Sequence, residues 1–434
     1  MPSAHEVYSS EADCSAPQLL VRQNISLFIK IYGAGAVLNL LFRLRSVSYR
    51  LPARTVAASL AIIAASFRLV SNVTHECGLG HIGPALAGIL AAPAFSLLPS
   101  EARPVLALYA VLKASEYFYN YLDDHGYFDW KPRWLGSWLL FPISMSQLFY
   151  TFVVEPEHCP RSFRLAMTQL SGAYLPEKPS GFPESKYWPT QTEVLAGVAK
   201  ISALRFPVFK SPLFYKNQVQ VWSPELKPIF SVLEYAHPGN TTMTGALLHP
   251  SEASELKAFA DTVGANFSKT TRYMLPLFLL VTLIKKRGLT SSTAVRALSS
   301  TLRSSVSLSM AAASAWAGIG LSQRLLGTRT LASTRFRVIG FMSGLWAFLD
   351  QVDGRARDLY LLRMAILSQY NILRAQKRFP SIPHGDVALF GAALAVVATL
   401  MDRYPAAVSS PGLRKAFNWM RFGDDSDPCP LPSN

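Results

Sequence analysis

The sequence predicts an all-α fold: a polytopic transmembrane helical bundle of two homologous halves, with about 8–10 membrane segments, joined by a helical surface linker. The first observation behind this prediction is composition. Of the 434 residues, 50% are hydrophobic and 16% are charged, and the mean hydropathy is +0.21. Soluble domains carry charge on about 25% of their residues, so this chain has little polar surface for its size. The apolar residues also lie in blocks, which is typical of membrane segments.

The second observation is that these blocks recur about 250 residues apart. The recurring groups are Ser59-Leu60 with Ser307-Leu308, Ala64-Ala65-Ser66 with Ala312-Ala313-Ser314, Gly136 and Phe141 with Gly385 and Phe390, and Ser115 and Tyr117 with Ser368 and Tyr370. Duplicated halves are common in polytopic membrane proteins, whose sites often lie between the halves. Chance similarity between helices rich in small residues is the alternative explanation.

The predicted domains follow these blocks. A disordered N-terminus covers residues 1–22, and a first membrane repeat covers residues 23–154. A helical linker punctuated by prolines covers residues 155–271, because so many prolines exclude one long helix. A second membrane repeat covers residues 272–403, and a disordered tail covers residues 404–434.

Each repeat contains five apolar segments. In the first repeat they are 25–42, 56–73, 82–98, 105–122 and 134–154, and in the second they are 273–284, 306–326, 336–349, 359–373 and 387–401. The segment 134–154 is the cleanest spanning candidate, at about twenty residues. In the linker, amphipathic helices are predicted over 193–204 and 250–267.

The number of spans in each half stays open. Five spans give inverted halves, whereas an interfacial first segment leaves four spans and parallel halves. Basic clusters follow the two first segments, at Arg43, Arg45, Arg50 and Arg54 and at Lys285, Lys286, Arg287 and Arg296. A shared positive side requires the four-span version.

The net charge of +15 does not predict a nucleic-acid partner, because the cations lie at the ends of apolar segments rather than in a basic domain. Such cations reach lipid headgroups. The expected partners are therefore membrane lipids, together with a second copy of the chain or another membrane protein. The four cysteines are scattered, without a CxxC pair, so neither a disulfide framework nor a thiolate metal site is expected.

Five charged residues lie in or at the ends of apolar segments and are the candidates for an internal substrate pathway. They are Arg68, Lys113, Glu116, Arg303 and Asp350. A charge at mid-membrane costs at least ~2.5 kcal/mol, so such residues usually face a bundle interior. In the alternative interpretation they lie near helix ends and snorkel to headgroups.

Closely spaced glycines are the candidates for helix packing: Gly33 and Gly35 in the first repeat, and the GxxxG pair Gly340 and Gly344 in the second. Small residues at this spacing let helix backbones approach each other.

Histidines suggest a second class of function, a membrane-embedded lipid-modifying enzyme. His75 and His81 flank a glycine-rich loop, and His237 and His249 each precede a proline. No HExxH, nucleophile elbow or phosphate-binding loop accompanies them, so no catalytic residue, metal site or cofactor is predicted.

The stretch from Arg272 to Met401 resembles the transmembrane protein 135 family. The residues that carry the resemblance are Tyr273-Met274-Leu275-Pro276, Ile284-Lys285-Lys286-Arg287, Leu349-Asp350 with Arg355 and Arg357, and Gly385-Asp386-Val387-Ala388-Leu389-Phe390. His237-Pro238 is similar to a His-Pro element of that family, although Asn240-Thr241-Thr242 stands where a cysteine usually follows.

This resemblance implies an integral membrane protein of peroxisomes or mitochondria, linked to lipid handling and organelle dynamics. The family is itself distantly similar to the channel subunits of the inner mitochondrial translocase. The function expected is non-enzymatic: lipid or metabolite movement, or organisation of an organelle membrane.

Overall fold

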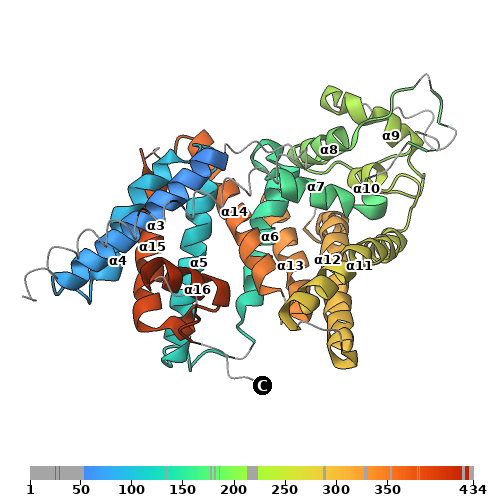
Figure 1. Cartoon of the computed structure of the whole chain (residues 1–434). Coiled ribbons are helices and arrows are strands. Elements are labelled where there is room, and N and C mark those ends of the chain that lie inside the picture. The colour runs from blue at the N-terminus through green and yellow to red at the C-terminus, as the bar shows by residue number, and fades with distance from the viewer. Residues whose placement is uncertain are drawn as a thin grey trace, which may run out of the picture. The chain divides into compact units, whose positions relative to one another are not determined.

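A computed structural model describes the chain as two compact units, one built from residues 1–132 and 381–434 and the other from residues 133–380 (Figure 1). The residues described are 25, 29, 53–132, 134–175, 178–179, 182–184, 186–212, 223–286, 290–326, 331–351, 354–378, 380, 382–422 and 426–429. Over these residues the secondary structure is helical, apart from one isolated bridge between Val208 and Thr242, which agrees with the predicted all-α class. The predicted N-terminus 1–22 and the glycines Gly33 and Gly35 lie outside the described residues, as does all of the first apolar segment except Ile25 and Ile29.

The first unit, called unit 1 here, is a small helical bundle. Its elements are α3 (Ala53–Glu76), α4 (Gly83–Ala91), η1 (Ala92–Leu97), α5 (Arg103–Asp124), α15 (Gly385–Arg403), η7 (Pro405–Ala407) and α16 (Pro411–Phe422). Helix α3 buries Ala57, Ala61, Ala64 and Phe67 along one face, at the spacing of a helix stripe. The predicted segment 82–98 is divided into α4 and η1, because Pro93 removes a backbone donor near the start of η1.

Contacts within unit 1 show which helix ends lie side by side. At one end, Arg403 Nη2 donates to the carbonyl of His81 at 2.6 Å, and the rings of Tyr121 and Tyr404 lie 4.6 Å apart. At the other end, Arg103 Nε lies 3.3 Å from Asp386 Oδ2. Helices α5 and α15 therefore run in the same direction, and their last turns lie beside the turn that follows α3.

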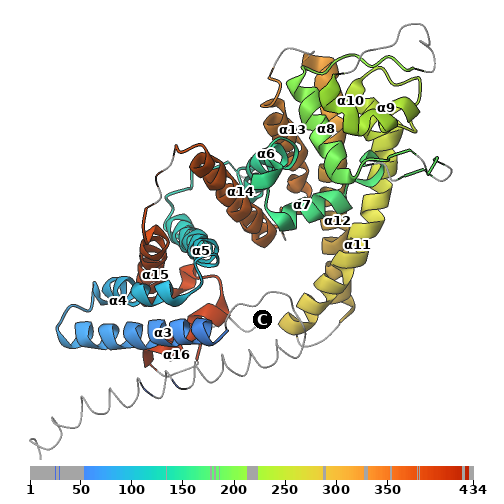
Figure 2. The same cartoon turned by 90° about the horizontal axis from the view of Figure 1, so that it is seen from above.

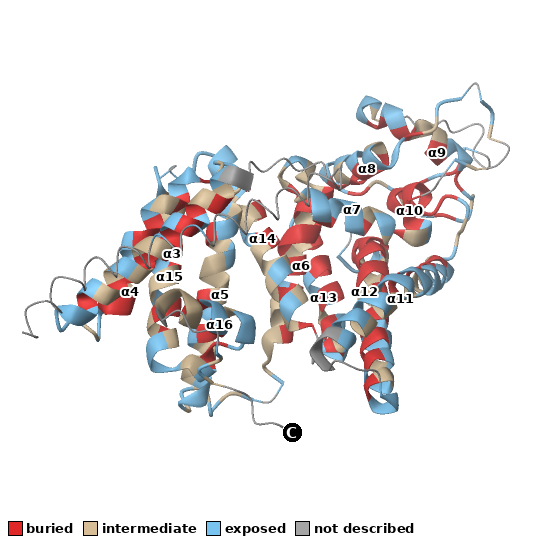
Figure 3. Cartoon of the chain, in the orientation of Figure 1, coloured by how far each residue is buried: buried red, intermediate tan, exposed pale blue. Residues whose placement is uncertain are grey.

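The second unit, unit 2, is larger. Its elements are η2 (Ser137–Leu139), α6 (Leu140–Val153), η3 (Pro156–His158), α7 (Arg161–Gln169), η4 (Gly172–Tyr174), α8 (Gln191–Ala203), η5 (Pro224–Ile229), α9 (Phe230–Tyr235), α10 (Met243–Leu248), α11 (Glu255–Lys286), α12 (Ser291–Leu326), α13 (Arg335–Gly344), η6 (Leu345–Asp350) and α14 (Arg355–Ala375). The buried faces of α6, α12 and α13 meet at its centre (Figure 3). Trp316 packs edge-on to Phe149 and Phe152 there, with ring centroids 6.3 and 5.9 Å apart.

The same helix arrangement occurs in both units. In unit 1, α15 packs against α4 and α5, and α3 packs against α4 and η1. In unit 2, α6 packs against α13 and α14, and α12 packs against α13 and η6. Two details also correspond: Ser59 Oγ donates to the carbonyl of Ala94 at 2.8 Å, and Ser307 Oγ donates to that of Trp346 at 3.0 Å.

The fourth helix of each set comes from the other half of the sequence. Helix α6 lies in the first predicted repeat but packs in unit 2, and α15 lies in the second repeat but packs in unit 1. Close backbone contacts fix both placements: a Cβ on Gly88 would lie 2.6 Å from Ala395 N, and Gly340 approaches the carbonyl of Met145. The compact units therefore do not coincide with the predicted repeats 23–154 and 272–403.

Two helices among the described residues are long and apolar enough to cross a membrane: Thr55–Glu76 and Gly385–Arg403. The predicted 8–10 membrane segments are therefore supported only in part. The segment 134–154, the cleanest candidate by sequence, is a helix of 14 residues buried on most sides. A helix that is apolar all round is often a core helix, and 14 residues span only about 21 Å.

The predicted linker is helical, as expected, but it is not a polar surface segment. Its helices contribute to the core of unit 2, with Val198, Ile201, Val232 and Leu247 fully buried. Their apolar faces pack on one another and on α6 and α12. Figure 2 also shows that the helix predicted over 250–267 continues with the segment 273–284 as one helix, α11, alongside α12.

The prediction of a disordered tail after Arg403 is wrong for residues 404–422 and 426–429. Phe417 of α16 is buried against Phe67 of α3, with ring centroids 5.7 Å apart. Arg414 Nε and Nη2 bind the two carboxylate oxygens of Asp427 at 2.7 and 2.8 Å. Leu413, Phe417 and Met420, which share one face of α16, supply the apolar contact that orders it.

Candidate ligand-binding cavity

The cavity in unit 2 is framed by a polar stripe on α11. Thr262, Asn266 and Lys269 recur at helical spacing and bind the backbone where α7 ends. Ala173 N donates to Thr262 Oγ1 at 3.1 Å, and Asn266 Nδ2 donates to the carbonyl of Leu170 at 2.6 Å. Lys269 Nζ donates to the carbonyl of Gln169 at 3.4 Å. Because these bonds satisfy backbone groups at the end of α7, they hold α7 beside α11.

Between these helices and α14 lies a cavity of about 830 Å³. Its walls come from α6, α7, α11, α12 and α14, so elements distant in sequence form it together. On the side opposite α11, Tyr360 Oη donates to Ser162 Oγ at 3.3 Å, which joins α14 to the start of α7. A volume of roughly 300–1,000 Å³ is usual for a small-molecule site.

The lining of this cavity is apolar with a few cations. Its larger apolar residues are Phe141, Met145, Phe163, Met167, Leu308, Leu361 and Met364. Its charged residues are Lys269, Arg272 and Arg357, and among the described residues that line it there is no aspartate or glutamate. The cavity is therefore suited to a ligand with an apolar body and a negative group.

Arg357 is held by carboxylates behind the cavity wall. Its Nη1 lies 2.6 Å from Asp350 Oδ2, and its Nη2 lies 3.0 Å from Asp358 Oδ1. The guanidinium also lies over the ring of Phe141, 4.9 Å from the centroid. Ser304 Oγ donates to the same Asp350 oxygen at 2.7 Å. These contacts fix one wall of the cavity and offset the charge of Arg357.

The buried carboxyl of Asp358 has an unusual acidity. Its pKa is raised from 3.8 to about 6, chiefly by desolvation and in smaller part by the neighbouring Asp350, against the opposing effect of Arg357. The proton on this group therefore changes between acidic and neutral pH.

The structure places the five candidate pathway residues in separate environments. Asp350 is 2% exposed and reaches the cavity through Arg357. Arg303 is exposed, donates from Nη2 to Ser299 Oγ at 2.8 Å, and does not line the cavity. In unit 1, Lys113 Nζ lies 2.8 Å from Glu116 Oε2, one helical turn away, and Arg68 is half-buried in α3. The five residues are thus divided between the two units, with three in unit 1 and two in unit 2.

Gly340 and Gly344 act in packing inside unit 2. Gly340 lies against Met145 and Phe149, and Gly344 lies against Pro142. All of these contacts are with α6, so the GxxxG face is covered within the chain.

The histidines predicted for the enzyme alternative are divided between the units, with His75 and His81 in unit 1 and His237 in unit 2. His75, His81 and His237 are exposed, and no group of three metal-binding side chains occurs among the described residues. His237 Nδ1 accepts from the backbone of Gly239 at 3.0 Å, a local turn contact.

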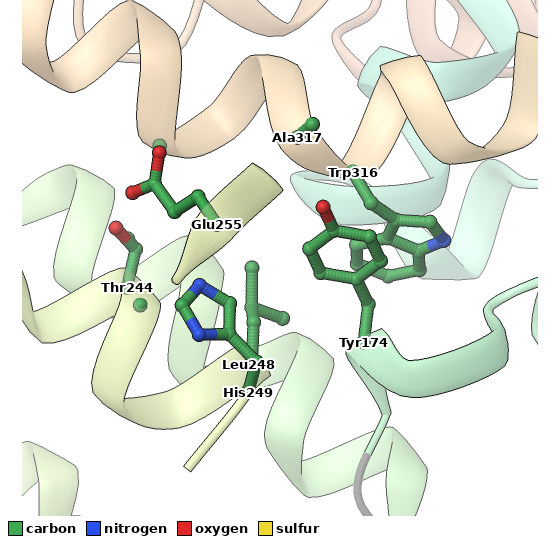
Figure 4. Close-up of a pocket in the computed structure, with 9 residues that line it drawn as sticks. Tyr174, Thr244, Leu248, His249, Glu255, Trp316 and Ala317 are labelled. Atoms are coloured by element: carbon green, nitrogen blue, oxygen red, sulfur yellow. The ribbon is translucent and has the colours of Figure 1, made fainter. Parts of the chain in front are cut away.

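His249 instead lines a second, small cavity of about 10 Å³ in unit 2 (Figure 4). Its Nδ1 donates to the carbonyl of Glu252 at 2.7 Å, which leaves Nε2 as an acceptor. Tyr174, Glu255 and Trp316 line the same space, and burial raises the pKa of Tyr174. This volume is enough for about one water molecule, so it is not a substrate pocket.

Sequence reasoning missed Lys269 and Arg272. Both fall where a linker was predicted to give way to a membrane segment. Their spacing with Thr262 and Asn266 along one helix was the available signal. No protein-family model matches the chain, and no curated protein or solved structure matches it either.

Proposed function

We propose that this protein is a non-enzymatic integral membrane protein that binds an amphiphilic lipid or metabolite in the unit 2 cavity and moves it at an organelle membrane. The observation that carries the proposal is the cavity of about 830 Å³, with an apolar lining and cations as its charged residues. Such a lining matches a molecule that is apolar at one end and negatively charged at the other.

Exposed apolar side chains support the membrane part of the proposal. Helix α3 exposes Leu60, Leu69 and Val73, and it is one of the two helices with the length and composition to span. In unit 2, Tyr273 is exposed at the cavity, and α11 and α12 expose further large apolar side chains outside its lining: Leu277, Leu280 and Leu283 on α11, and Val295, Leu298 and Leu302 on α12. Exposed large apolar side chains that recur along two packed helices are typical of a lipid or protein contact.

The matching helix contacts of the two units support homologous halves. An ancestral set of four helices, duplicated with its fourth helix exchanged, accounts for α15 in unit 1 and for α6 in unit 2. Duplicated halves are frequent in membrane proteins that move substrates. The organelle, a peroxisome or a mitochondrion, follows from the resemblance to the transmembrane protein 135 family.

Lipid analysis of the purified full chain tests the proposal. The chain is purified in mild detergent, and co-purified lipids are identified by mass spectrometry. Ala166 lines the cavity and is exposed on α7, so Ala166→Trp is expected to block the cavity without disturbing the core. The neighbouring Leu165 is exposed and outside the lining, which makes Leu165→Trp the matched control.

Wild type and Leu165→Trp are expected to retain lipid, and Ala166→Trp is expected to lose most of it. In vesicles, the same order is expected for transfer of a fluorescent lipid. Equal lipid content in all three proteins, or none in any of them, would contradict the proposed function.

A further inference from the structure

We infer that the unit 2 cavity takes an acidic single-chain amphiphile, with its anionic headgroup bound by Lys269 and Arg272 and its chain lying among the apolar side chains behind them. The inference rests on the proposed function and names its substrate class.

The three cations that line the cavity differ in their partners. The charge of Arg357 is offset by its contacts with Asp350 and Asp358. Lys269 has one long hydrogen bond, to the carbonyl of Gln169, and Arg272 has no hydrogen bond or ion pair with any described residue. An ammonium has three donors, so Lys269 can bind a headgroup while it keeps this bond. Two cations without carboxylate partners thus belong to the cavity.

Lys269 and Arg272 lie close together at the rim of the cavity. Lys269 and Arg272 lie three residues apart on α11, so their side chains are neighbours on the helix surface. Both are exposed at the cavity rim, where a charged headgroup keeps part of its hydration. A carboxylate or a phosphate accepts charge-assisted bonds from such a pair, and arginine can bind it with two parallel bonds.

The large apolar side chains of the cavity lining are suited to the chain of the ligand. Phe141, Met145, Phe163, Met167 and Met364 are buried and line the cavity. Methionine side chains adapt to irregular apolar ligands. The cavity volume of about 830 Å³ lies within the range for one small ligand, which favours a single chain over a two-chain phospholipid.

Exposed apolar side chains on α11 give a ligand chain access to the cavity. Tyr273, next to Arg272, lines the cavity and is 72% exposed. Leu277 and Leu280 continue along α11 as exposed apolar side chains. A lipid chain can therefore pass from the apolar surface of α11 into the cavity while its headgroup stays at the level of Lys269 and Arg272.

Competition binding tests the inference on the full chain in detergent. Oleate, oleyl alcohol and lysophosphatidate displace an uncharged fluorescent alkyl probe, whose binding does not depend on the two cations, and their apparent affinities are compared. Oleate and oleyl alcohol share a chain, so their ratio isolates the headgroup. We expect wild type to prefer oleate about tenfold, which corresponds to about 1.4 kcal/mol. The ratio of lysophosphatidate to oleate distinguishes a phosphate headgroup from a carboxylate, and a preference for either supports an anionic ligand.

The double variant Lys269→Glu/Arg272→Glu is expected to lose the preference for oleate while it still binds oleyl alcohol. Arg296→Glu/Arg303→Glu makes the same charge change at two exposed positions of α12 outside the lining, and it is expected to behave like wild type. Binding of both oleyl compounds without a preference, or a preference that survives in Lys269→Glu/Arg272→Glu, would overturn the inference. Failure to bind either compound would instead overturn the proposed function.

Discussion

Arg357, which is half-buried, and the buried Asp350 form an ion pair at 2.6 Å that joins the start of α14 to the end of η6. Gly354, between them, allows this arrangement, since a Cβ there would lie 2.6 Å from Arg357 Nη2 and 2.7 Å from the carbonyl of Asp350. The pair lies at the wall of the cavity, so it gives that wall a fixed shape.

Removing the carboxylate of Asp350 is expected to destabilise the protein. Asp350→Asn leaves Arg357 with one carboxylate partner in a buried site, and breaking a buried pair costs about 3–5 kcal/mol. Thermal unfolding in detergent measures the change. Glu234→Gln removes an exposed partner of Lys186 and serves as the control, with an expected change below about 1 kcal/mol. Equal unfolding temperatures for the two variants would contradict a structural role for Asp350.

The pKa of Asp358 predicts a pH dependence of stability. In the folded chain this pKa is raised to about 6 from an ordinary 3.8, so between these values the folded state binds more protons than the unfolded state. Stability contributed by the protonated carboxyl is therefore present at low pH and is lost as pH rises through about 6. Unfolding measured from pH 4 to 7 is expected to show this loss.

Asp358→Asn provides the comparison for this pH dependence. The amide keeps the size of the carboxylic acid but does not ionise, so the decline between pH 4 and 6 is expected to be shallower than in wild type. An identical pH profile would exclude Asp358 as the titrating group.

Gly340 is expected to tolerate no larger side chain. A Cβ at this position meets the carbonyl of Met145, which is main chain and cannot move aside without shifting α6. Gly340→Val should lower the unfolding temperature by several degrees, because overpacking typically costs about 1–3 kcal/mol. Gly264, in α11, has open space around it, so Gly264→Ala is expected to be neutral or to stabilise by up to ~1 kcal/mol. Similar effects of both changes would refute close packing at Gly340.

The topology of unit 1 can be tested by labelling. If α3 and α15 both span, the exposed thiol of Cys77 and a cysteine placed at Tyr404 are expected on one side of the membrane, since Arg403 binds the carbonyl of His81. Cysteines at Ser100 and His384 are expected on the other side, since Arg103 pairs with Asp386. A membrane-impermeant thiol reagent in intact organelles distinguishes the sides, with single-cysteine chains. Labelling of all four positions from one side would mean that these helices do not span.

Most helices could be predicted from the sequence because their apolar residues follow the helical period. The segments 56–73, 105–122 and 387–401 all lie within helices of the structure. Sequence periodicity does not predict what surrounds each helix. An apolar helix in a core and one in lipid have the same composition, and for this reason α6 was predicted to span.

The candidate site was predicted only in part. Asp350 was selected as a charge in an apolar segment, and the structure pairs it with Arg357 beside the cavity. The cavity itself depends on α6, α7, α11 and α14, which are far apart in sequence. Such long-range contacts are not visible in the sequence, so Lys269 and Arg272 are not among the predicted site residues.

The exchanged helices have a consequence for biosynthesis. Helices α3, α4 and α5 are made early, but the partner that covers Gly88 and Phe95 is α15, which begins about 290 residues after Phe95. Until then the apolar side chains of the nascent unit stay uncovered and depend on chaperones or on lipid. A chain that stops before Gly385 lacks this cover permanently, so a premature stop near the C-terminus damages the N-terminal part of the protein first.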